Sequence, residues 1–280
     1  MVDAIALMFR DGALLRRAMI PALIFVGILA LLANADLDPN PKHEQATWWG
    51  RFYFAVIASA SVSPIIFTRV YARLAARARV SAGFDPAPPY LRGYGEATWE
   101  SILQLVGLGW YATPFLWLGK TVPGTFWPIT FLLFAWASHW SAVEALDAAR
   151  SAPEQAREEA AGRVLVLPWF ARQPSKGSRL HRFRALTYPF TAWGHPFARA
   201  FRRWNGELHF MEARPATALG FTLAVALVLL VPVLNLFARP LTVMAAALWL
   251  AHDEHADAAS LESAVELGQG VDGGRALSRA

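Results

Sequence analysis

Long uncharged stretches alternate with charged segments along this chain. Six windows contain no Asp, Glu, Lys or Arg: 18–35, 52–68, 101–119, 121–143, 215–238 and 240–251. A helix needs roughly 20 apolar residues to cross the hydrocarbon core of a bilayer, and most of these windows approach that length. The pattern predicts an all-α fold, namely a polytopic α-helical membrane protein with two long transmembrane helices and two hairpins.

The first long transmembrane helix is predicted at 18–35. A cleaved signal peptide is the alternative, because Arg16 and Arg17 precede the apolar run and 33–35 resembles a small-residue cleavage site. The further apolar windows favour retention of this segment as a membrane helix.

The second long helix is predicted at 52–82. It would be roughly 46 Å long at 1.5 Å per residue, which exceeds a hydrocarbon core of about 30 Å. We expect its second half to protrude from the bilayer. Arg69, Arg73 and Arg77 are spaced by four residues and should therefore form a basic stripe on one face.

The remaining windows predict two hairpins, over 101–143 and 215–251. The last arm, 240–251, spans only 12 residues, or roughly 18 Å of helix, which is too short to cross. We therefore expect one or both hairpins to be partly re-entrant, turning back inside the membrane. The turn of the second hairpin is marked by Pro232, Asn235 and Pro240.

Composition and charge distribution support the same reading. The chain is 55% apolar and 17% charged, whereas ordinary soluble domains are about 45–50% apolar and about 25% charged. With a cytoplasmic N-terminus, 22 of the 26 Lys and Arg residues fall on the inner side and only Lys42, Arg51, Lys120 and Arg239 on the outer side. This asymmetry predicts a multi-pass inner-membrane protein with both termini cytoplasmic. The net charge of +5 is not read as nucleic-acid binding, since such a domain needs no apolar windows.

We expect one membrane domain over 1–257. A polar, cytoplasmic or interfacial insert covers about 147–214, and an acidic tail at 258–280 should be disordered. Within the insert, the apolar spacing from Phe197 to Met211 predicts an amphipathic helix. It either lies in the membrane interface or packs on the body of the protein.

Motifs for catalysis and for cofactor or metal binding are weak, so no enzyme activity, cofactor or metal is predicted. The segment 119–121 ends like a phosphate-binding loop, but Pro114 stands where that loop needs a glycine. His252 and His255 lack further ligands nearby. Glu144 and Asp147 flank a window and form no obvious acid–base pair.

One constellation suits an oxyanion. Arg16 and Arg17 stand at the start of the first membrane helix, with Gly12 four residues before Arg16. The backbone N–H groups of a helix start favour anions, and guanidinium groups bind oxyanions by two-pronged hydrogen bonds. The alternative is that both arginines only anchor the topology.

Several stretches resemble the CysZ family of bacterial sulfate permeases and the wider etoposide-induced-protein family. The most specific is PVLNLFARP at 232–240, followed by an Ala-rich arm ending in Trp249. Supporting matches are RRAMIP at 16–21, SPIIF at 63–67 and EALD at 144–147.

The resemblance implies two long helices plus helix pairs that penetrate the bilayer partway, assembled as a homo-oligomer. It also implies sulfate, or another small oxyanion, as the ligand. The family's Gly-Leu-Arg motif corresponds to Leu15, Arg16 and Arg17, with the glycine displaced to Gly12. The expected function is an inner-membrane permease for sulfate or a related anion. The alternatives are a non-transporting membrane scaffold of the same fold and, with only Glu144, Asp147 and His139 to support it, a lipid-modifying enzyme.

Overall fold

The computed structural model describes residues 1–34, 67–160, 202–231 and 237–256, and within them the fold is all-α, as predicted. An isolated antiparallel bridge joins Pro89 to Ser151. The helices are α1 (Val2–Arg10), α2 (Gly12–Asn34), α4 (Tyr94–Thr121), α5 (Phe126–Ala149), α6 (Ala152–Ala160), the 3-10 turn η3 (Arg202–Trp204), α8 (Asn205–Ala213) and α9 (Pro215–Leu230). Two further helical segments are named here by their character: the basic helix at 67–81 and the core helix at 238–256.

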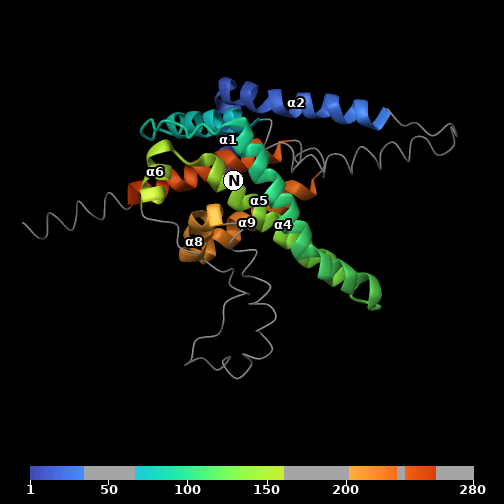
Figure 1. Cartoon of the computed structure of the whole chain (residues 1–280). Coiled ribbons are helices and arrows are strands. Elements are labelled where there is room, and N and C mark those ends of the chain that lie inside the picture. The colour runs from blue at the N-terminus through green and yellow to red at the C-terminus, as the bar shows by residue number, and fades with distance from the viewer. Residues whose placement is uncertain (35–66, 161–201, 232–236, 257–280) are drawn as a thin grey trace, which may run out of the picture.

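The core helix occupies the centre of the bundle (Figure 1). Between 240 and 251 every side chain except Trp249 is buried. A helix that is apolar all round is stable in this position, since it has no polar face to turn toward water. The arm expected to be too short for a membrane crossing therefore forms part of the hydrophobic core, with Tyr71, Val143 and Val225.

Ion pairs fix both ends of the core helix. At its end, Glu254 pairs with Arg79 of the basic helix at 3.0 Å. One residue earlier, Asp253 accepts hydrogen bonds from Arg214 at 2.5 Å. Arg214 directly precedes α9, so this ion pair joins the start of α9 to the end of the core helix, at the open end of the second hairpin.

At the start of the core helix, Arg239 pairs with Glu144 of α5 at 2.7 Å. Arg239 was expected in an outer turn and Glu144 on the inner side, and because the two side chains touch, these two expectations do not both hold. Pro240 is buried in the first turn of the core helix. The other turn residues, Pro232 and Asn235, lie outside the described residues.

The α4–α5 hairpin projects from the rest of the bundle (Figure 1). Its turn uses Gly124 at φ 80°, a conformation that favours glycine. In the part of the chain that the structure describes, α5 is the one helix long and apolar enough to cross a membrane, and 44% of its most apolar window is buried. The bent pair α8 and α9, which meet at 114°, is a second candidate if counted as one span.

One other expectation is confirmed. The basic helix exposes Arg69, Arg73 and Arg77 on one face while it buries Tyr71, Leu74 and Ala78. The open question of the amphipathic insert helix is settled over its described part: Trp204 and Met211 are buried, so η3 and α8 pack on the body of the protein.

The predicted helix over 52–66, the middle of the insert (161–201) and the tail at 258–280 lie outside the described residues.

Candidate functional site

The residues predicted to bind an anion lie together in the first two turns of α2. This helix begins at Gly12, earlier than the apolar window suggested, and follows α1 after the single residue Asp11. Arg16 and Arg17 are both exposed, whereas Leu15 packs against the core. Arg16 Nε donates to the carbonyl oxygen of Gly12 at 3.3 Å.

The N-terminus of α2 already holds a carboxylate. Asp11 Oδ1 accepts a hydrogen bond from the Ala13 backbone N–H at 2.9 Å. Its Oδ2 accepts from Ser81 Oγ at 2.7 Å and from Arg77 Nε at 3.1 Å. These donors, Ser81 first, lower the pKa of Asp11 to about 2. Because Asp11 occupies the helix start, an external anion would bind to the guanidinium groups of Arg16 and Arg17 instead.

We predict that Asp11→Ala lowers the melting temperature of the protein, because it removes the link between α2 and the basic helix and exposes the α2 N-terminus uncapped. Asp3→Ala is the matched control, since Asp3 is an exposed carboxylate on α1. Melting followed by circular dichroism in detergent distinguishes them. A shift of equal size in both variants would contradict the role of Asp11.

A second cluster, the charged junction, lies where α4, α5, the core helix and α8 meet. We define it as Arg92, Arg150, Arg203 and Arg239 with Glu96, Glu100, Glu144, Asp147 and Glu207. Apart from Glu96, their side chains are no more than 13% exposed. Charges so deep in a protein are stable only when paired and hydrogen-bonded.

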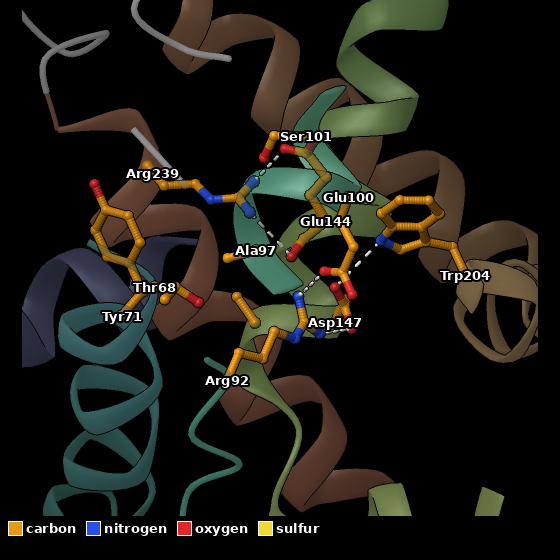
Figure 2. A pocket seen from close by; sticks show the side chains of 11 residues that line it. Thr68, Tyr71, Arg92, Ala97, Glu100, Ser101, Glu144, Asp147, Trp204 and Arg239 are labelled. Atoms are coloured by element: carbon orange, nitrogen blue, oxygen red, sulfur yellow. Dashed lines mark hydrogen bonds and ion pairs between the residues drawn. The ribbon is translucent and has the colours of Figure 1, made fainter. Parts of the chain in front are cut away.

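Arg92 and Asp147 form the centre of the junction (Figure 2). Arg92 pairs with Asp147 and approaches Glu100 at 3.5 Å. The other oxygen of Asp147 accepts a hydrogen bond from Trp204 Nε1 at 3.2 Å. Burial opposes the charge of Arg92, but the carboxylates around it, Asp147 first and then Glu207 and Glu96, together raise the pKa of Arg92.

Arg239 occupies the opposite side of the same cavity. Its Nη1 donates to Glu144 Oε2 at 2.7 Å and its Nη2 donates to the Glu144 backbone carbonyl at 3.2 Å. Figure 2 shows the Arg239 and Arg92 guanidinium groups pointing toward the carboxylates between them. The junction thus joins the core helix to α5 and α5 to the loop that carries Arg92.

The third part of the junction holds η3 and α8. Arg150 pairs with Glu207 at 2.9 Å, and Arg203 pairs with Glu96 at 2.9 Å and with Glu100. Burial, followed by the Arg92 charge, lowers the pKa of Arg203 to about 10. Burial raises the pKa of Glu207 to about 7, although Arg150 acts in the opposite direction. Near neutral pH, loss of the proton from Glu207 therefore adds one negative charge to the junction.

The cavity inside the junction has a volume of about 30 Å³, which is room for one or two water molecules. Thr68 and Tyr71 of the basic helix complete its wall (Figure 2). The arrangement is therefore suited to holding water and helices in fixed positions. A sulfate ion does not fit in it without movement of the walls.

Sequence reasoning noted Glu144 and Asp147 but found no partner for them. The three-residue spacing puts both on one helix face, and their burial demands positive partners. Burial of these two carboxylates therefore predicts that cationic side chains lie next to them. It does not identify the cations as Arg92 and Arg239, which are distant in the sequence.

The other candidates remain isolated. Over the described part of the chain, no group of three or more His, Asp or Glu side chains could hold a metal ion. His252 and His255 contact the ring of Phe84, with centroid distances of 4.8 and 5.4 Å. Gly119, in the segment that resembled a phosphate loop, packs on Ile129 in the α4–α5 hairpin.

Comparisons with known proteins give no relatives. No protein-family model, no curated protein and no solved structure matches the chain.

Proposed function

We propose that the chain is a multi-pass α-helical protein of the bacterial inner membrane with both termini cytoplasmic. Support comes from apolar side chains that no part of the described protein covers. They line α2, the tip of the α4–α5 hairpin and the outer face of α9: Ile20, Leu23, Leu31, Trp117, Phe126, Trp127, Phe131, Leu219, Leu223 and Leu227 are all exposed. Soluble monomers rarely expose contiguous apolar surfaces of this kind.

The second hairpin fits a re-entrant element better than a crossing one. Its turn side contacts α5 through Arg239 and Glu144, and its open side is closed by Arg214 and Asp253. The core helix between them is buried in protein, the condition under which broken backbone is tolerated at membrane depth.

Within the membrane, we propose a permease for a small oxyanion such as sulfate, working as a homo-oligomer. The observation that carries this proposal is the exposed Arg16–Arg17 pair, at the point where the outer face of α2 changes from charged to apolar. A guanidinium pair at a membrane boundary can capture a doubly charged oxyanion without a metal. The family resemblance points to the same residues.

We expect proteoliposomes that contain the full chain to take up labelled sulfate, and Arg16→Gln/Arg17→Gln to reduce uptake at least tenfold. The tenfold figure is a minimum, because a single charge-assisted hydrogen-bonding group contributes about 1.5–3 kcal/mol and about 1.4 kcal/mol already corresponds to a factor of ten. Arg157→Gln is the control, since it removes an exposed arginine on α6. Equal uptake by the double variant and the wild type would remove Arg16 and Arg17 from the proposal.

A non-transporting scaffold of the same fold is the second candidate. It is favoured by the charged junction, whose cavity has room for no more than one or two water molecules and whose pairs join five elements. Folded wild-type protein that takes up neither sulfate nor phosphate, compared with empty vesicles, would support the scaffold.

A further inference from the structure

We infer that one side of the bundle, the basic face, binds the headgroups of anionic phospholipids. The basic face is defined by four exposed arginines of α1 and the basic helix: Arg10, Arg69, Arg73 and Arg77. The inference rests on the membrane part of the proposed function and not on transport of an anion.

The elements of the basic face are joined to one another. Asp11, which follows α1, accepts hydrogen bonds from Ser81 and Arg77 of the basic helix. Figure 1 shows α1, the start of α2 and the basic helix at the same edge of the molecule. Arg69 continues this line toward α4, where its guanidinium lies 4.7 Å from the centre of the Tyr94 ring. The arginines therefore form one surface rather than separate charges.

This surface has a large excess of positive charge. Across 1–34 and 67–81 the only carboxylates are Asp3 and Asp11, and Asp11 already has three donors. Among the described residues, no carboxylate lies within ion-pair distance of Arg10 or Arg73. Their charge is available to an external anion.

The apolar neighbours of the arginines identify that anion as a lipid headgroup. Phe9, next to Arg10 in α1, is 67% exposed, and Val2, at the other end of the same helix, is 78% exposed. On α2, exposed Ile20 and Leu23 lie within two turns after Arg16 and Arg17. Guanidinium groups bordered by exposed apolar side chains match the boundary between headgroups and acyl chains. A soluble polyanion would leave those apolar side chains in water.

The test counts bound lipid. The purified full chain is equilibrated in mixed micelles with equal amounts of phosphatidylglycerol and phosphatidylcholine, and the retained lipids are counted by native mass spectrometry. We expect preferential retention of phosphatidylglycerol. Arg10→Gln/Arg73→Gln should reduce this preference at least fivefold, since each basic residue near an anionic surface contributes about a fivefold factor. Raising the salt concentration from 0.1 to 1 M should weaken it further.

Matched single variants make the outcome specific. Arg73→Gln and Arg157→Gln each remove one exposed arginine, but only Arg73 belongs to the basic face. Loss of the preference in the first and not in the second supports the inference. An equal loss of the phosphatidylglycerol preference in both variants, or no such preference in the wild type, overturns the inference. An acidic protein segment would then be the partner to test. A chain that stays in solution without detergent would instead refute the membrane proposal.

Discussion

Arg239→Leu is expected to lower the free energy of unfolding by about 3–5 kcal/mol. The variant leaves the Glu144 carboxylate, whose side chain is 10% exposed, without its charged partner in the interior. It also removes the hydrogen bond from Arg239 Nη2 to the Glu144 carbonyl. Because this pair connects the core helix to α5, the loss should appear in global unfolding rather than in local fraying. Denaturant titration in detergent micelles measures it.

Two controls separate burial of charge from loss of contact. Glu144→Leu/Arg239→Leu removes both charges, and we expect it to recover most of the lost stability, because apolar pairs often replace buried ion pairs at little cost. Arg157→Leu breaks the exposed pair with Glu254 at 3.4 Å and should cost less than about 1 kcal/mol. A double variant as unstable as Arg239→Leu would contradict the account of Glu144 as an uncompensated charge.

Much of the helical fold could be predicted from apolar length and spacing. The first window and the 101–143 hairpin correspond to α2, α4 and α5, and the four-residue spacing of Arg69, Arg73 and Arg77 predicted the exposed face of the basic helix. These features are local, because a helix fixes which side chains share a face whatever it packs against. The start of α2 was placed too late because the uncharged window omitted the arginines that the helix includes.

The position of the core helix could not be predicted in the same way. Its sequence is apolar on every face, which suits burial in lipid and burial in protein equally well. The burial of its side chains, and the contacts that Arg239 makes with Glu144 and Asp253 with Arg214, show that this arm lies inside the bundle. These contacts join residues 39 to 95 positions apart, and spacing within one helix gives no information on them.

The charged junction shows the same limit for the site. Glu144 and Asp147 were visible in the sequence as carboxylates at the end of an apolar window. Arg92, in an irregular loop, and Trp204, in a 3-10 turn, have no periodicity that would connect them with α5. The structure brings them to Asp147 because burying that carboxylate requires hydrogen-bond donors from whatever elements pack nearby.

The charged junction should also make stability depend on pH through Glu207. Burial raises the pKa of Glu207 in the folded protein from its ordinary value of 4.5 to about 7. The folded state therefore holds this proton more tightly than the unfolded state. The resulting stabilisation is fully present below about pH 4.5, declines as the pH rises, and is lost above about pH 7, for a total of roughly 3 kcal/mol. Unfolding titrations in detergent between pH 4.5 and 8 measure this decline.

Two variants change this decline in opposite ways. Glu207→Gln keeps the shape of the side chain without a titrating proton, so the part of the decline due to Glu207 should disappear. Arg150→Gln removes the cation that pairs with Glu207 at 2.9 Å and lowers its pKa, so the decline should extend to higher pH. Asp147 and Arg92, the other charges that act on Glu207, remain in both variants. If Glu207→Gln keeps the full decline, another carboxylate of the junction holds the proton. If Arg150→Gln shifts the decline to lower pH, the Arg150–Glu207 pair does not act as the geometry indicates.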